Sequence, residues 1–462
     1  MAVTSQALTI SDVIDQRRMS RFQIWTVVLC GVVLILDGFD AQTVGFLVPS
    51  ISQSTGIPVH SFGQILSSSL VGLMIAAMAT GPIADRWGRK WPIVISALSF
   101  AVFSVLTARA TTYNELLAYR FLTGLGLGGA MPNVVALASE YVPKHLLSAV
   151  VTVLFTGMPL GGTICGLLSS AMIKTWGWRW VFYIGGIVPL AIALFLILLL
   201  PESVQFLVVR GKDSRKVRKL LSHIAPQLAA EGVTFHPAAR DALRKGLPVK
   251  HLFTEGRAAG TILLWIPNFM NLLILYFING WLPALLKESG MSASAGATAT
   301  AFVSLGGIFA CLVEGSLMSL CGSYLILLIE FGFATLFLGA LAFISHSFPL
   351  ALAVTFATGF LVIGAQSGLN ALAAKFYPTS VRSTGVGWAL GVGRIGSIVG
   401  PLLGGMLLKI GWEPRQILMS GALSAVCAGL AIALSKSFRK HPTAYAAEHI
   451  SSSTHLEEEV RA

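Results

Sequence analysis

Twelve long apolar segments divide the chain, and this feature constrains its fold more than any other. A helix needs about 20 mostly apolar residues to cross the hydrocarbon core of a bilayer. Charged residues make up only 11% of the 462 residues, against roughly a quarter in soluble domains. The sequence therefore predicts an all-α membrane protein with twelve transmembrane helices. The apolar segments are about 22–48, 62–84, 92–108, 112–139, 148–172, 179–200, 258–286, 294–320, 323–344, 348–376, 383–408 and 414–435.

Basic residues are divided unevenly between the two sides that such helices would create. If the N-terminus is cytoplasmic and the helices alternate, 24 of the 32 Lys and Arg residues fall on the cytoplasmic side and 6 on the outer side. Cytoplasmic loops of membrane proteins carry an excess of this kind, so we expect both termini in the cytoplasm. The formal net charge of +12 then reflects membrane topology and does not indicate a nucleic-acid partner.

The apolar segments form two groups of six that resemble each other. Gly124 precedes Pro143 by 19 residues, and Gly359 precedes Pro378 by the same number. Weak repeats of parallel six-helix halves are typical of major-facilitator transporters, which consist of two pseudo-symmetric bundles. The predicted organisation is a cytoplasmic N-terminus at 1–21, a six-helix bundle at 22–201, a cytoplasmic central loop at 202–257, a second six-helix bundle at 258–435 and a cytoplasmic tail at 436–462.

The sequence GPIADRWGRK, at 81–90, joins the second and third predicted helices. It resembles the G-x-x-x-D-R-x-G-R-K signature of the major facilitator superfamily. Because a helix N-terminus attracts anions, Asp85 could contact the start of the eleventh helix near Ser383 and latch the halves in an outward-open state. Gly88 is expected to supply a left-handed turn. The alternative is a solvated basic turn that only sets topology. The predicted gating network comprises Asp85, Arg86, Gly88, Arg89, Glu140 and Arg382.

The equivalent loop of the second half, SLCGSYL at 319–325, has neither the acid nor the basic cluster. A second latch is therefore absent, or it is made by Glu314. Glu330, in the ninth predicted helix, is interpreted only as a structural partner for another helix.

Two carboxylates lie inside the first apolar segment, in the sequence LDGFD that ends at Asp40. A charge at that depth costs about 3 kcal/mol or more and usually marks a transport path. Asp37 and Asp40 are three residues apart and share a helix face, so both could line one cavity that water reaches. Close carboxylates favour protonation of one of them, which suits a group that binds a proton outside and releases it inside. The alternative is that both only accept hydrogen bonds between helices.

The LDGFD sequence resembles the D-G-x-D motif of the aromatic acid:proton symporter family. The similarity also covers GPIADRWGRK and the stretch from Tyr377 to Pro401, and it extends over essentially the whole chain. It implies the major-facilitator fold, a bacterial inner membrane, the proton gradient in place of any cofactor, and a monomer. Substrates in this family are 4-hydroxybenzoate, protocatechuate, benzoate, hydroxyphenylpropionate or chlorinated phenoxyacetates. Overall similarity favours a phenoxyacetate such as 2,4-dichlorophenoxyacetate.

An anionic aromatic substrate requires a cation and a partly apolar site. Only Arg120 and Arg394 lie deep within predicted helices, and a guanidinium binds a carboxylate through two parallel hydrogen bonds. Arg394 is the first candidate, whereas Arg120 either contacts the substrate or neutralises an aspartate of the first helix. Amides and aromatic rings in the membrane supply the remaining candidates. The predicted substrate site comprises Arg394, Arg120, Phe39, Gln42, Asn271, Tyr276, Asn279, Gln366 and Asn370.

The predicted mechanism is uptake by alternating access. None of the nine histidines lies within the predicted apolar segments, so we expect Asp37 or Asp40 to carry the proton. A proton-driven exporter with the same fold is an alternative. A membrane enzyme is not favoured, because we find neither a nucleophile–base set nor a set of metal ligands. A transporter-like receptor is not favoured either, because the central loop and the tail are short and polar.

Overall fold

In the computed structural model, twelve helices among the described residues are long and apolar enough to cross a membrane, which confirms the predicted fold class. No β-strand occurs among the described residues, so the chain is an all-α, multi-pass membrane protein. Most of the predicted N-terminal segment, central loop and tail fall outside the description. The structure describes residues 14–15, 18–209, 220, 222–224, 249–254, 256–344, 347–378 and 381–437.

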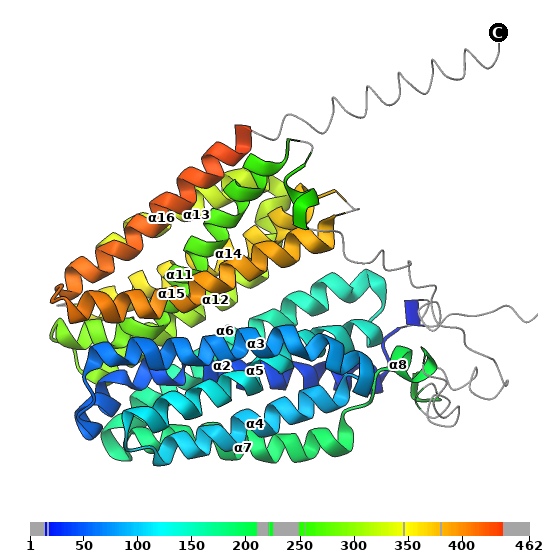
Figure 1. Ribbon diagram of the computed structural model, residues 1–462, viewed down its shortest axis with the longest axis horizontal. Coiled ribbons are helices and arrows are strands. Elements are labelled where there is room, and N and C mark those ends of the chain that lie inside the picture. Colours follow the sequence, from blue (N-terminus) through cyan, green and yellow to red (C-terminus); the bar gives the residue numbers. More distant parts are fainter. Residues whose placement is uncertain are drawn as a thin grey trace, which may run out of the picture.

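The first six membrane helices form one bundle, drawn in blue to green in Figure 1. Within it, α3 packs against α5, α2 against α6, and α4 against α7. The elements are α2 (Arg21–Thr55), η1 (Val59–Ser61), α3 (Phe62–Trp87), α4 (Lys90–Arg109), α5 (Tyr113–Tyr141), α6 (Lys144–Thr175), α7 (Trp178–Leu199) and the short α8 (Val204–Val209).

The last six membrane helices form the second bundle and repeat this arrangement. Here α12 packs against α14, α11 against α15, and α13 against α16. A shift of 235 residues places α5 on α14 from end to end. The elements are η2 (Val249–Leu252), α11 (Ala258–Glu288), α12 (Ala293–Cys321), α13 (Ser323–Leu341), α14 (Phe348–Phe376), α15 (Arg382–Lys409) and α16 (Pro414–Ser437).

Several helices extend beyond their apolar segments, as α2 shows. The sequence predicts this helix at about 22–48, yet it continues to Thr55. Ser20 and Gln23 form a capping box at its start. Gly56 ends it with φ 73°, a conformation that residues with a Cβ rarely adopt. Hydropathy marks the part of a helix that can lie in hydrocarbon, whereas the caps determine where it ends.

Glycines at matching positions bring the helices of each bundle into backbone contact. A Cβ built on Gly124 of α5 would overlap the carbonyl oxygen of Ser69 in α3. One built on Gly359 of α14 would overlap the carbonyl oxygen of Val303 in α12. These two glycines are the pair related by the 19-residue spacing, so the sequence repeat corresponds to a repeated packing contact.

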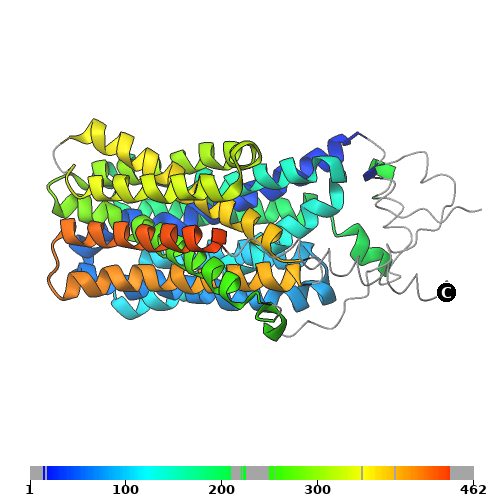
Figure 2. The same ribbon diagram turned by 90° about the horizontal axis from the view of Figure 1, so that it is seen from above.

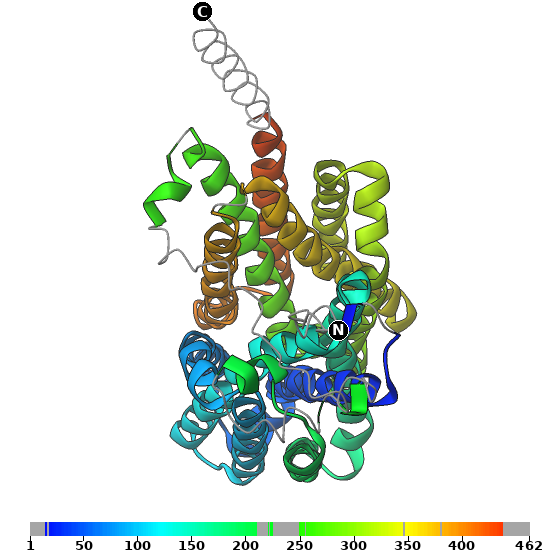
Figure 3. The ribbon, with the colours of Figure 1, turned by 90° about the vertical axis from the view of Figure 1, so that its right-hand side faces the viewer.

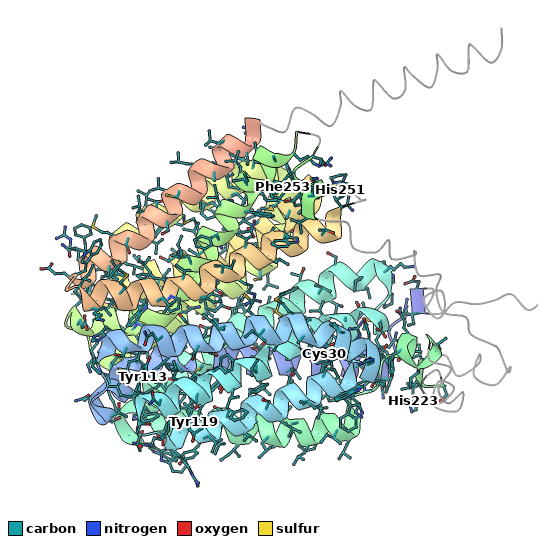
Figure 4. The ribbon with its side chains drawn as sticks, viewed as in Figure 1. Cys30, Tyr113, Tyr119, His223, His251 and Phe253 are labelled. Atoms are coloured by element: carbon teal, nitrogen blue, oxygen red, sulfur yellow. The ribbon has the colours of Figure 1, made fainter. Side chains whose placement is uncertain are left out.

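The two bundles converge at one end of the molecule and separate at the other (Figure 1). We call the end with α8, η2 and the start of α2 the α8 side, and the opposite end the far side. Figure 4 labels His223 and His251 on the α8 side and Tyr113 towards the far side. Figure 2 shows the membrane helices running along the long axis between these ends. Figure 3 shows the two bundles one above the other, viewed from the α8 side.

Backbone contacts join the bundles on the far side, between α2 and α11, α3 and α15, and α6 and α12. We call these contacts the far-side seam. A Cβ built on Gly45 of α2 would overlap the carbonyl oxygen of Asn279 in α11. The hydroxyl of Thr298 in α12 donates to that of Ser170 in α6 at 2.7 Å. The far side is therefore closed.

On the α8 side, the facing helices α3 and α15 have exposed surfaces. Ala77, Met78 and Ala79 of α3 are all exposed, although successive helix residues point to different faces. A Cβ built on Gly387 or Gly391 of α15 would meet nothing within 4 Å. The described conformation is closed on the far side and open on the α8 side.

Candidate functional site

Asp37 and Asp40 lie midway along α2, and the prediction that water reaches both is wrong for this conformation. Each is only 1% exposed. A Cβ built on Gly38, between them, would overlap the backbone of Met158 in α6. The two helices therefore touch at their backbones beside the acids, and this close approach excludes water. It also keeps both acids away from lipid.

Asp40 is neutralised by Arg120 of α5. Nη2 of Arg120 lies 2.9 Å from Oδ2 of Asp40, and Nη1 lies 3.4 Å from Oδ1. Nη2 also donates to the Asp40 carbonyl at 3.2 Å, and both side chains are 1% exposed. The ring of Phe182 lies 5.9 Å from Cζ of Arg120. Of the two roles predicted for Arg120, the structure shows the ion pair with a helix aspartate. A contact between Arg120 and substrate stays a prediction.

Asp37 has no such partner. Its Oδ1 is buried and accepts no hydrogen bond from the described residues. Arg394 of α15, in the other bundle, lies close enough to act on Asp37 electrostatically. Among the described residues, Arg394 forms no ion pair within 4.0 Å. A carboxylate and a guanidinium thus interact across the interface between the bundles while neither is held in a contact pair.

Arg394 is partly exposed, and the neighbours of its guanidinium hold it loosely. Nη1 lies 3.5 Å from the hydroxyl of Tyr276 in α11, and Nη2 lies 4.0 Å from Sδ of Met131 in α5. Both distances are long for hydrogen bonds. Arg394 and Tyr276 are therefore brought together as predicted, and donors of the guanidinium remain available to a ligand.

Four amides from α11 and α14 form one hydrogen-bonded group. Asn271 donates from Nδ2 to Oε1 of Gln366 and to the Val362 carbonyl, both at 3.0 Å. Gln366 donates from Nε2 to Asn370 at 3.2 Å and to Asn268 at 3.5 Å. Oδ1 of Asn271 is buried and has no described donor. This group, which we call the amide cluster, therefore contains one buried acceptor without a donor among the described residues.

The other predicted side chains divide between the interface and the bundle interior. Oε1 of Gln42 accepts from the hydroxyl of Ser304 in α12 at 3.0 Å, which joins the two bundles. Asn279 lies at the far-side seam, and its Oδ1 is buried without a described donor. The ring of Phe39 instead packs on Gly185 of α7. In this conformation Phe39 contributes to the first bundle and is not brought to the interface.

The turn between α3 and α4 is built around Glu202, a residue that sequence reasoning did not place in any site. Gly88 has φ 92°, the conformation expected of it, and a Cβ there would overlap the Glu202 carboxylate. Oε1 of Glu202 accepts from the backbone N–H of Arg89 at 2.7 Å and of Lys90 at 3.1 Å. These two N–H groups lie at the start of α4, where the helix itself supplies no acceptor for them, and such groups favour an anion. The position of Glu202 directly after Pro201, at the end of a membrane helix, was the available signal.

Asp85, the predicted latch residue, is exposed, as is Arg86. Its only ion pair among the described residues joins Oδ1 to Nη2 of Arg89, one helical turn on, at 3.4 Å. The predicted contact with the start of α15 belongs to the outward-open state. Because the structure is open on this side, the latch stays a prediction.

The last two gating residues are held within their own bundles. Glu140, at the end of α5, accepts a hydrogen bond from the hydroxyl of Ser203. Arg382, at the start of α15, donates from Nε to the Tyr377 carbonyl at 3.3 Å. Neither residue contacts Asp85 in this conformation.

The interface between the bundles therefore holds one loosely held guanidinium and one buried carboxylate without an ion-pair partner among the described residues. The amide cluster lies between α11 and α14 of the second bundle. A guanidinium of this kind can bind an organic anion, and the carboxylate can bind a proton. No group of three or more His, Cys, Asp or Glu side chains that could hold a metal occurs in the part of the chain that the structure describes.

Comparison with known proteins places these features in a family. Residues 30–401 match the family model described as Major Facilitator Superfamily. The 4-hydroxybenzoate transporter PcaK of Pseudomonas putida is 39% identical over 427 residues, which cover 92% of this chain and 95% of that protein. The gallate transporter of Pseudomonas putida is 37% identical over 425 residues, covering 92% and 94%.

The fold also matches that of solved transporters. A bacterial homologue of the human lysosomal transporter Spinster, in an inward-facing and occupied conformation, superposes with a TM-score of 0.71. The match covers 91% of this chain and 98% of that one at 14% identity, so it describes the fold alone.

Proposed function

We propose, because this chain belongs to the major facilitator superfamily and to the aromatic-acid transporters within it, that it moves small aromatic carboxylates across a bacterial inner membrane together with protons. The chain is a transporter and not an enzyme. The observation that supports the proposal most is Arg394, which is partly exposed between the bundles and has no ion pair among the described residues. A cation in a membrane is costly, and a site for an anionic substrate explains its presence.

The substrate carboxylate binds Arg394 through a two-pronged hydrogen bond, for which the planar guanidinium is well suited. Because its contacts to Tyr276 and Met131 are long, Arg394 loses little interaction energy when it exchanges them for the substrate. Arg120 is held by Asp40, so Arg394 is the better candidate for this contact.

The amide cluster recognises the substituents on the aromatic ring of the substrate. Oδ1 of Asn271 has no described donor, and a phenolic hydroxyl group could supply one. Two relatives are named as transporters of 4-hydroxybenzoate and of gallate, and both of these compounds have hydroxylated rings. We therefore put 4-hydroxybenzoate and gallate first among candidate substrates and keep benzoate and 2,4-dichlorophenoxyacetate in the same panel.

Asp37 is the proposed proton carrier. Membrane potential opposes the entry of an anion by about 2.3 kcal/mol per charge per 100 mV, and one proton cancels that charge. A proton on Asp37 also removes the carboxylate that competes with substrate for Arg394. Proton and substrate therefore favour each other's binding. Because Asp37 is 1% exposed here, the cycle must open a water path to it in another state.

The excess of Lys and Arg at the termini and in the central stretch supports a cytoplasmic α8 side. The described conformation is then open to the cytoplasm. Return to the outward-open state requires the far-side seam to part and the Asp85 latch to form on the α8 side. The two bundles of one chain enclose the whole path, so we propose that the monomer transports.

The test is uptake of radiolabelled acids from the panel into vesicles that contain the purified protein, with an imposed pH gradient, acidic outside. We expect the gradient to accelerate uptake, and Asp37→Asn to reduce the acceleration while exchange of substrate across the membrane continues. Glu413→Gln, at an exposed acid on the far side, is the matched control and should behave as wild type. Acceleration in Asp37→Asn as large as that of wild type would refute the role of Asp37, and absence of any acceleration in wild type would refute proton coupling.

A further inference from the structure

Two further acids meet inside the second bundle, away from the interface between the bundles. Glu314 of α12 is 2% exposed and Glu330 of α13 is 3% exposed. Glu314 precedes the end of α12 by seven residues, and Glu330 follows the start of α13 by seven. With a rise of about 1.5 Å per residue, both lie roughly 10 Å deep from the α8 side. We call Glu314 and Glu330 the glutamate pair.

Oxygens of both side chains lie within 3.4 Å of one point, the position of a Cβ built on Gly364 of α14, and no described donor reaches any of their four carboxylate oxygens. An ionised carboxylate only accepts hydrogen bonds. A hydrogen bond between the two glutamates therefore requires a proton on one of them. Two ionised carboxylates at this depth would repel each other, and no described donor would offset the repulsion.

The repeat shows that this fold does not require acids here. In α14, a Cβ built on Gly364 would lie 2.5 Å from Oε1 of Glu330 and 3.4 Å from Oε2 of Glu314. The glycine at the matching position of α5, 235 residues earlier, is Gly129, which faces the side chains of Ser96 and Thr80. Neutral side chains thus serve the same packing position in the first bundle, so the two acids are present for their charge or their protons.

The surroundings favour a proton over a metal ion. Apolar atoms of Ala310, Met318 and Leu327 line the pair, whereas hard cations require about six or more oxygen ligands. Cys311 is the titratable group that faces Glu314. Among the described residues, the other charged residues of α14, and of α16, which packs against α13, are Lys375, Arg415 and Lys436, all near helix ends.

We propose that Glu314 and Glu330 share one proton and that this proton is a second one moved in each transport cycle. The inference rests on the proposed function. Asp40 is tied to Arg120, so among the aspartates of α2 only Asp37 is free to carry a proton. A second proton would give the cycle net positive charge, so that the membrane potential drives uptake of an anion. The glutamate pair supplies the carrier for it.

The test measures how far substrate accumulates in vesicles at zero membrane potential under a fixed gradient of one pH unit. Each coupled proton supports about tenfold accumulation per pH unit. With two protons, wild type should reach about a hundredfold, and Glu314→Gln or Glu330→Gln should reach about tenfold. A glutamine amide donates to the remaining carboxylate, so each variant keeps the hydrogen bond without needing the proton.

The controls separate the possible failures. Glu288→Gln, at an exposed acid outside both sites, should accumulate substrate as wild type does. Exchange of labelled for unlabelled substrate needs no net proton movement and should persist in both glutamine variants, and its loss in both would contradict the proposal. About hundredfold accumulation in the variants, or only about tenfold in wild type, would overturn the shared proton and leave the proposed function standing. No pH-driven accumulation in wild type would overturn both.

Discussion

Replacing Arg120 by Gln leaves Asp40 as a buried carboxylate with no cation beside it among the described residues. At the observed 2.9 Å and an effective dielectric constant of about 20, the attraction between the two charges is about 6 kcal/mol before desolvation is subtracted. Breaking a buried pair from one side typically costs about 3–5 kcal/mol, because the remaining charge is uncompensated. We expect a loss of that size in the free energy of unfolding for Arg120→Gln, and a similar loss for Asp40→Asn.

The double variant Asp40→Asn with Arg120→Gln removes both charges and should lose less than the sum of the two single variants. Unfolding in mixed micelles with increasing denaturing detergent, followed by tryptophan fluorescence, gives the four free energies of the cycle. We expect a coupling energy of at least about 2 kcal/mol. Arg109→Gln, at an exposed arginine, is the control and should change stability by less than about 1 kcal/mol. Losses that add within about 0.5 kcal/mol would refute the view that the pair acts as a unit.

Three further substitutions test other parts of the structure. Arg394→Lys keeps the charge but loses the two-pronged hydrogen bond, so Kd for 4-hydroxybenzoate measured by calorimetry should rise about tenfold or more; an unchanged Kd would contradict the assignment. Gly45→Ala places a methyl group against the α11 backbone and should open the far side, seen as faster labelling of a cysteine introduced into the seam, whereas Gly315→Ala, in open space, should not. Glu202→Gln weakens the cap on α4 and should lower the unfolding free energy by about 1–2 kcal/mol.

The membrane helices were predictable because hydrocarbon imposes a length and a composition on each of them. Their ends were less so, because short polar caps determine them, as Gly56 does for α2. The pairing of Asp40 with Arg120 was one of two alternatives, since 80 residues separate them and the sequence does not give the rotation of α5. The burial of Asp37 was missed because Gly38 lets α6 approach more closely than a water-lined face would allow.

The meeting of Glu314 and Glu330 left a signal in the sequence that was not used. Two residues at equal distances on either side of a tight turn between antiparallel helices lie at the same depth. Only the orientation of α13 about its axis was then needed to bring them together, and hydropathy gives no precise value for it. The same limit applies to Phe39, whose ring packs on α7 although the sequence placed it beside the aspartates.

Glu202 has a mechanical consequence for the transporter. Its carboxylate accepts hydrogen bonds from the backbone N–H groups of Arg89 and Lys90. Its own backbone carbonyl accepts a hydrogen bond from the hydroxyl of Tyr141 at 2.6 Å. We therefore expect the α3–α4 turn, the end of α5 and the start of α8 to move together as a rigid unit. A force applied to α8 would therefore reach the turn that carries Asp85, and a molecule that immobilises α8 would slow turnover from a distance, with substrate affinity unchanged.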